Sequence, residues 1–87
     1  MSPTIRREGS YRFYFNSNEE TRMHVHVEGH SGKAKFWLEP LLSLADFHGL
    51  KRYELSEIQE IIEKYKEEFE NAWREHFHQG ADHQHRE

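Results

Sequence analysis

The sequence predicts a small α+β domain in which an antiparallel β-meander of three to four strands packs against one long C-terminal amphipathic helix. The chain has 87 residues, which is enough for one domain. Residues 23–28 and 33–38 alternate between apolar and polar side chains, as half-buried strands do. Beyond residue 55 the apolar residues instead recur every three or four positions, which is the spacing of a helix with one buried face.

The strands are separated by residues typical of turns. Residues 11–15 are rich in β-formers and predict a strand. Residues 16–20 have loop chemistry, and residues 29–32 carry two glycines suited to a hairpin. The segment 41–50 fits either a fourth strand or a helical turn, and we favour a short strand.

The helix is expected to begin at Ser56, because Gln59 three residues later would complete a capping box. Gly80 has the residue type that commonly ends a helix. We therefore predict a single domain over residues 1–79 and a polar, disordered tail over residues 80–87. The apolar stripe of the helix comprises Ile58, Ile61, Ile62, Tyr65, Phe69, Ala72, Trp73 and Phe77.

Composition excludes some classes of protein and favours others. The chain has no cysteine, so thiolate catalysis and thiolate metal sites are excluded. The absence of disulfides, of a leader-like segment and of a long apolar run predicts a cytoplasmic protein that does not enter membranes. The net charge is −4, and the acidic residues concentrate in the predicted helix, which leaves the strand region mildly basic.

Strand parity divides the side chains between two faces of the sheet. One face is apolar and is expected to pack on the helix; it comprises Tyr11, Phe13, Phe15, Val25, Val27, Ala34, Phe36 and Leu38. The other face is basic and aromatic with two central imidazoles; it comprises Arg12, Tyr14, His24, His26, Glu28, Lys33, Lys35 and Trp37.

The polar face has three interpretations. The first is an ordinary solvated sheet face or a surface that docks a partner protein, the second is a site that acts on RNA, and the third is a metal site. In the RNA interpretation, His24 and His26 are the catalytic base and acid, because imidazole titrates near neutral pH. Basic and aromatic side chains would bind phosphate and stack on bases without any cofactor, and these are Arg12, Tyr14, Lys33, Lys35 and Trp37.

The metal interpretation depends on the His-x-His pattern, because alternate residues of a strand point the same way. His24, His26 and Glu28 would then be ligands to zinc, with His30 nearby. Zinc takes three or four protein ligands, so a two-histidine pattern is a weak signal.

Several segments together resemble the bacterial family catalogued as domain of unknown function 4160. The resemblance rests on residues 11–15, on His24-Val25-His26-Val27-Glu28, on residues 34–40 and on the helix from Leu55 to Trp73. It covers about residues 3–78. Family members commonly have two prolines directly before His-x-His-Val, whereas this chain has Arg22 and Met23 there.

The resemblance implies a small cytosolic bacterial protein encoded beside a second small protein, in an arrangement like a type II toxin–antitoxin pair. It therefore predicts a toxin-type component with an antitoxin-like partner, and a homodimer is compatible with the charge distribution. The resemblance transfers no catalytic residues, and the sequence does not decide whether the protein is an enzyme.

Overall fold

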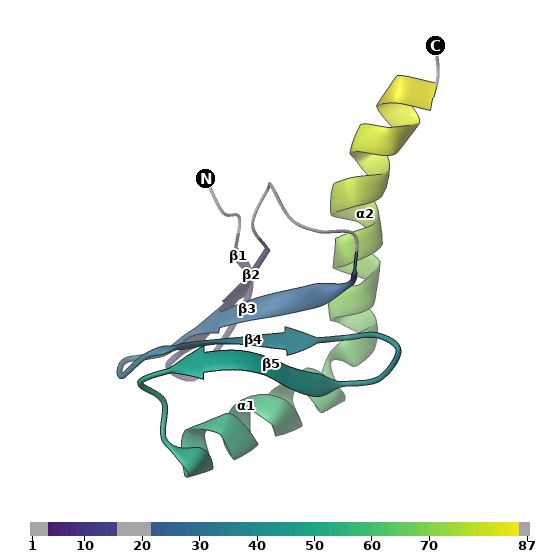
Figure 1. Ribbon diagram of the computed structural model, residues 1–87. Helices are drawn as coiled ribbons and strands as arrows, with labels where there is room; N and C mark the ends of the chain where they lie inside the picture. Colours follow the sequence, from purple (N-terminus) through teal and green to yellow (C-terminus); the bar gives the residue numbers. More distant parts are fainter. Residues whose placement is uncertain (1–3, 16–21, 86–87) are drawn as a thin grey trace.

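The computed structural model describes residues 4–15 and 22–85, with side chains up to residue 77. It is an α+β fold with a five-stranded antiparallel sheet in the order β1-β2-β3-β4-β5, followed by two helices (Figure 1). The elements are β1 (Thr4–Glu8), β2 (Tyr11–Tyr14), β3 (His24–Glu28), β4 (Lys33–Trp37), β5 (Ser43–His48), α1 (Arg52–Lys64) and α2 (Lys66–His85).

The predicted α+β meander is confirmed, but its strand count was too low. The short strand expected within residues 41–50 is present as β5. β1 adds a fifth strand, which pairs with β2 through a turn at Gly9, where φ is +61°. The predicted loop over residues 16–20 lies outside the described residues.

The prediction of one long helix was wrong in two respects. The helical segment is interrupted at Tyr65, whose φ of −110° and ψ of 23° depart from helical values. The first helix also begins four residues before Ser56, because Glu54 caps it by accepting hydrogen bonds from the Lys51 N–H and the Ser31 hydroxyl, each at 2.8 Å. These two donors lower the pKa of Glu54.

α2 continues through Gly80 to His85, so Gly80 does not end the helix. The helical backbone can include a glycine at a cost of about 1 kcal/mol relative to alanine. The predicted domain boundary after residue 79 remains a prediction, and residues 86–87 of the predicted tail lie outside the described part.

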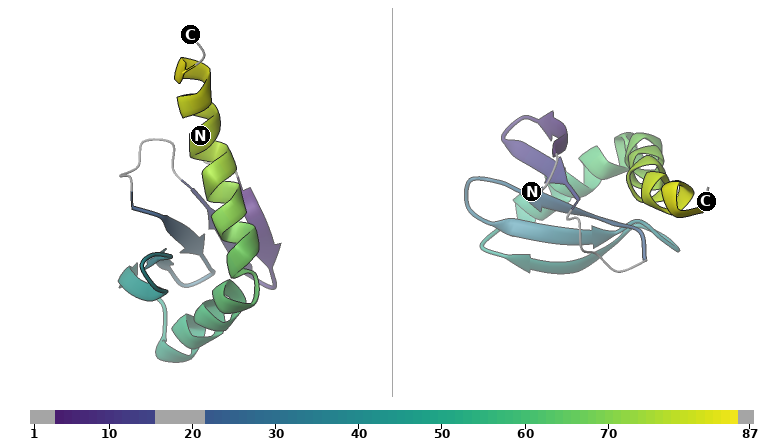
Figure 2. Two further views of the ribbon diagram at one scale, coloured as in Figure 1. Left: turned by 90° about the vertical axis from the view of Figure 1, so that its right-hand side faces the viewer. Right: turned by 90° about the horizontal axis from the view of Figure 1, so that it is seen from above.

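The junction between the helices is attached to the first strand. The guanidinium of Arg6 lies 3.6 Å from the centroid of the Tyr65 ring, and its Nε is 3.4 Å from Glu68 Oε1. α1 lies along one face of the sheet, whereas α2 turns away and runs past the ends of the strands (Figures 1 and 2). This arrangement leaves the opposite face of the sheet free of helices.

The predicted apolar face is confirmed as the core. All eight of its members are buried, and they pack against Ile58 and Ile62 of α1 and against Phe69 and Trp73 of α2. Phe13 meets Phe69 with ring centroids 5.2 Å apart, and Phe15 meets Trp73 edge-on at 5.3 Å. Aromatic pairs of this kind contribute about 0.5–1.5 kcal/mol beyond the area that they bury.

Within the described residues, neither helix combines the length and the apolar character needed to cross a membrane.

Candidate functional site on the open face of the sheet

The face of the sheet that the helices leave uncovered, here called the open face, is organised as cross-strand rows. Neighbouring strands lie about 4.8 Å apart, so residues in register form continuous lines of side chains. The first row is Arg7, Arg12, Glu28, Lys33 and His48. The second row is Thr4, Tyr14, His26, Lys35 and Asp46.

These two rows carry a surplus of positive charge. They contain four cationic side chains, Arg7, Arg12, Lys33 and Lys35, and two carboxylates, Glu28 and Asp46. The whole chain has a net charge of −4, so the open face differs in sign from the rest of the molecule. Such a surface attracts anionic groups, and the attraction weakens with salt.

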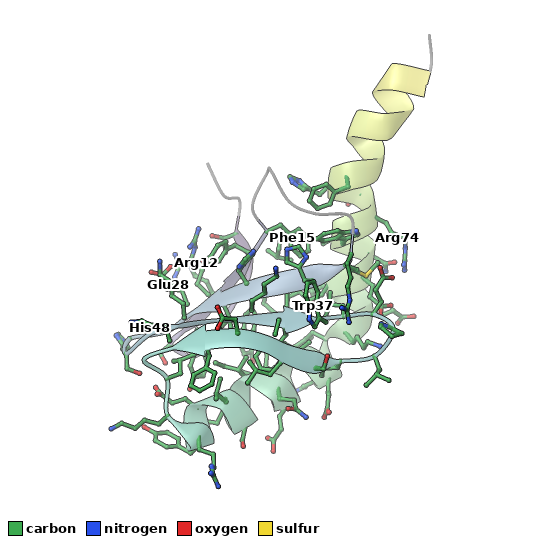
Figure 3. The ribbon with its side chains drawn as sticks, viewed as in Figure 1. Arg12, Phe15, Glu28, Trp37, His48 and Arg74 are labelled. Atoms are coloured by element: carbon green, nitrogen blue, oxygen red, sulfur yellow. The ribbon has the colours of Figure 1, made fainter. Side chains whose placement is uncertain are left out.

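Arg12 is held in place by three neighbours. Its Nη1 lies 3.1 Å from Glu28 Oε1, its Nε donates to Thr4 Oγ1 at 2.7 Å, and its guanidinium lies 4.5 Å from the centroid of the Tyr14 ring. Figure 3 shows Arg12 and Glu28 next to each other near the end of the sheet that also carries His48. The position of Arg12 is therefore fixed before any ligand binds.

Both aromatic side chains predicted to stack on bases already have stacking partners. The Tyr14 ring lies against His26 at 5.4 Å with an interplanar angle of 20°. The Trp37 ring is approached by the Arg22 guanidinium at 4.0 Å and by Lys35 Nζ at 4.5 Å. A base that binds here would extend these stacks at His26 or displace a cation from Trp37.

A depression of about 250 Å³ lies on the open face. Tyr14, His26, Lys33 and Lys35, all predicted site residues, line it together with Asp46 and His48. Asp46 and His48 were not among the site residues predicted from the sequence, because residues 41–50 had no assigned register. These two residues are identified as part of the depression by the pairing of β4 with β5, which places Asp46 beside Lys35 and His48 beside Lys33.

His24 does not lie on the surface of the open face. Its side chain is fully buried, because α2 passes the end of the sheet where β3 begins (Figure 1). The ring meets Trp73 of α2 at 5.0 Å and Trp37 at 5.6 Å, both edge-on. His24 Nδ1 lies 2.7 Å from the Arg22 carbonyl oxygen, and since a carbonyl only accepts, Nδ1 is the donor.

His26 is the member of the His-x-His pair that is partly exposed. The two imidazoles are in edge-to-face contact, with centroids 5.1 Å apart. The predicted pair is thus brought together, but its members differ in access to solvent. His26 is accessible from the depression, whereas buried His24 packs against the ring of His26.

Among the described residues, His24 and His26 have no third ligand with which to hold a metal ion. Over residues 4–15 and 22–77, no group of three or more His, Asp or Glu side chains is close enough to hold one ion. Glu28, the predicted third ligand, is paired with Arg12 instead. Elemental analysis of the untagged protein tests the zinc alternative directly.

A second cavity, of about 510 Å³, lies beside α1 at the turn between β1 and β2. Here the hydroxyl of Tyr11, a residue that is largely buried, donates to Glu57 Oε1 at 2.7 Å. Burial, reinforced by this hydrogen bond, raises the pKa of the Tyr11 phenol above its ordinary range. The contact ties the second strand to the first helix and is part of the structural framework.

The fold and the open face define a class of protein: a small α+β domain with an antiparallel meander, helices on one face and a cationic, aromatic surface on the other. The family comparison makes this more specific. The chain belongs to the family described as Domain of unknown function (DUF4160), whose sequence model matches residues 10–74. No curated protein and no solved structure matches the chain. The family resemblance inferred from the sequence is thus confirmed.

Proposed function

We propose that this protein is the toxin-type component of a type II toxin–antitoxin pair and that it binds RNA through the open face. The observation that carries the RNA part is the pair of cross-strand rows, which gathers four cations on one surface of an acidic chain. RNA binding depends chiefly on neutralising phosphates, and stacking on aromatic rings adds to it. The toxin–antitoxin part rests on the family resemblance, and its partner is an antitoxin-like protein.

Each residue of the open face has a distinct role in this proposal. Lys33 and Lys35 contact phosphates, since they line the depression side by side with His26 and His48. Arg12, fixed by Glu28 and Thr4, orients the strand of RNA at the other end of the row. Tyr14 and Trp37 support stacked bases through His26 and Arg22.

Any chemistry on RNA would be carried by His26 rather than by a His24/His26 pair acting equally. His26 reaches the depression and is able to act as a general base or acid near neutral pH. His24 is a positioning residue, because its buried ring abuts the ring of His26. A His26→Gln variant would keep the fold and RNA binding but lose cleavage.

The deciding experiment compares growth of a bacterial host on induction of the wild type, of Lys33→Glu/Lys35→Glu, and of a matched control. Arg52→Glu is a suitable control, because Arg52 is exposed at the start of α1, the helix on the opposite face of the sheet (Figure 1). RNA binding by each purified protein is measured in parallel by electrophoretic mobility, and folding is checked by circular dichroism.

We expect the wild type and Arg52→Glu to arrest growth and to bind RNA, and the double lysine variant to do neither while remaining folded. If all three proteins fail to bind RNA, the RNA part of the proposal is wrong. If the folded double variant arrests growth as the wild type does, toxicity comes from another surface.

The burial of His24 favours one alternative, a non-catalytic module that binds a partner protein. In that case the His-x-His pattern serves to pack the start of β3 against α2 rather than to perform chemistry. His26→Ala would then leave both the cellular phenotype and partner binding unchanged.

A further inference from the structure

The outer edge of β5 is available for pairing with another strand. β5 is the last strand of the sheet, and among the described residues only β4 pairs with it. Figure 1 shows β5 as the outermost strand of the sheet, with β4 above it and the helix α1 below it in this view, and no described strand lies on its outer side. An edge of this kind presents backbone N–H and C=O groups that template the addition of a strand.

Apolar side chains are exposed along this edge. Leu44 is 41% exposed and Phe47 is 48% exposed. Their register partners on β4 are the buried Phe36 and Ala34, so both side chains lie on the helix-covered side of the sheet, at its margin. A further strand would bury them by continuing the core outwards. The other edge strand, β1, exposes no large apolar residue.

Asp46 determines what kind of strand fits. It ends the second cross-strand row on the open face. Its carboxylate accepts the N–H of Phe47 at 2.9 Å, and it forms no ion pair with any residue of the described ranges. A basic residue directly opposite Asp46 on an added strand would therefore gain a charge partner, and such pairs stabilise a sheet.

The same carboxylate disfavours a second copy of this chain. A two-fold pairing of two β5 edges is antiparallel, and Asp46 lies near the middle of Ser43–His48. The two Asp46 carboxylates would come close to each other, and like charges opposed across a sheet are destabilising. The register of β4 and β5 shifts between Lys35 and Phe36, which leaves Ala45 as an extra residue in β5. β5 is therefore irregular, and pairing two copies of it would place two irregular strands against each other.

We propose that β5 binds an extended segment of a partner protein as a sixth strand. The segment has a Lys or Arg opposite Asp46, and apolar residues on either side of it that cover Leu44 and Phe47. Main-chain hydrogen bonds would supply affinity, and the alternating side chains would supply specificity. This surface lies at the edge of the sheet and does not depend on RNA binding by the open face.

The probe is a short synthetic peptide with a central Val-Arg-Val sequence, and the matched control has Val-Glu-Val in its place. Each is titrated into isotopically labelled protein up to about 1 mM, so that binding with a dissociation constant of about 1 mM or below is detected. Backbone amide shifts and amide exchange report which strand is contacted. The proteins are the wild type, Asp46→Lys and Phe47→Ser, each checked for folding by circular dichroism.

We expect the wild type to bind the Arg peptide about threefold to tenfold more tightly than the Glu peptide, as a cross-strand charge pair predicts. Asp46→Lys should reverse this preference, and Phe47→Ser should weaken both peptides. Amides of β5 should gain protection. Lys33→Glu/Lys35→Glu should still bind the peptide through β5, so that failure of RNA binding and failure of this proposal can be told apart.

Three results would overturn the proposal. The first is the absence of any change in β5 amides at the highest peptide concentration. The second is a preference for Arg that persists in Asp46→Lys. The third is a dimer in which the β5 amides are already protected without peptide, which would show that a second copy occupies the edge.

Discussion

Replacing His24 by alanine should destabilise the fold far more than replacing His26, although the two residues belong to one motif. His24 is fully buried and contacts Trp73, Trp37 and the ring of His26. His26 is partly exposed, and its replacement removes the stack on Tyr14 and the edge contact with His24. The comparison therefore separates a structural histidine from one that remains available for function.

The magnitude follows from the contacts that disappear. The hydrogen bond to the Arg22 carbonyl at 2.7 Å contributes about 1 kcal/mol. The edge-on contacts with two tryptophans contribute about 0.5–1.5 kcal/mol each, and the cavity left behind adds to the loss. We expect His24→Ala to lower the free energy of unfolding by about 2–4 kcal/mol, and His26→Ala to lower it by less than about 1 kcal/mol.

Urea denaturation followed by tryptophan fluorescence measures both variants, because Trp73 and Trp37 adjoin the affected site. In a chain of this length each kcal/mol shifts the melting temperature by about 4–8 °C, so thermal denaturation is a second readout. His24→Phe, which keeps a ring but loses the donor, should fall between the two alanine variants. Equal losses in His24→Ala and His26→Ala would refute the assignment of His24 to the interior.

Three further outcomes are expected. If RNA binds to the open face, Lys33→Ala/Lys35→Ala should reduce the slope of log K against log salt concentration by about 1.4, because two phosphate contacts with a single strand are lost; an unchanged slope would mean that neither lysine meets phosphate. The Tyr11 phenol has a raised pKa in the folded state, so its contribution to stability is present below the unfolded pKa and is lost as the pH rises from there through the folded pKa. Tyr11→Phe should therefore flatten the alkaline fall in stability, as measured by urea denaturation at several pH values, and should cost about 1 kcal/mol at neutral pH through the lost bond to Glu57. Gly49→Ala should destabilise by about 2–3 kcal/mol, since φ is +85° and an added Cβ would overlap the Ser31 carbonyl oxygen. Gly9→Ala, also at positive φ but with open space around it, should cost about 1 kcal/mol, and equal losses from the two glycine variants would argue against the overlap.

The two faces of the central strands could be predicted from the sequence because strand parity is a local property. A period of two decides that Phe13 and Val25 point one way and Tyr14 and His26 the other, whatever the rest of the chain does. The composition of the core and of most of the open face followed from this. The amphipathic stripe likewise predicted that Ile58, Ile62 and Phe69 would be buried.

Positions that depend on contacts between distant segments could not be predicted in this way. The helix starts at Arg52, where Glu54 accepts the Lys51 N–H and is held by a second hydrogen bond from Ser31, in the hairpin between β3 and β4. The helix is interrupted at Tyr65, where Arg6 of β1 contacts the ring. Neither contact follows from the spacing of apolar residues along the helical segment.

Sequence patterns alone predicted the α+β class, the apolar core face and the cationic character of the opposite face, because these depend on side-chain chemistry and on the periods of strands and helices. Tertiary structure decided which candidates share a site. The register of β5 against β4 brought Asp46 and His48 to the depression. The path of α2 past the start of β3 buried His24 and left His26 partly exposed, because a helix that crosses one end of a sheet covers the residues at that end of its strands.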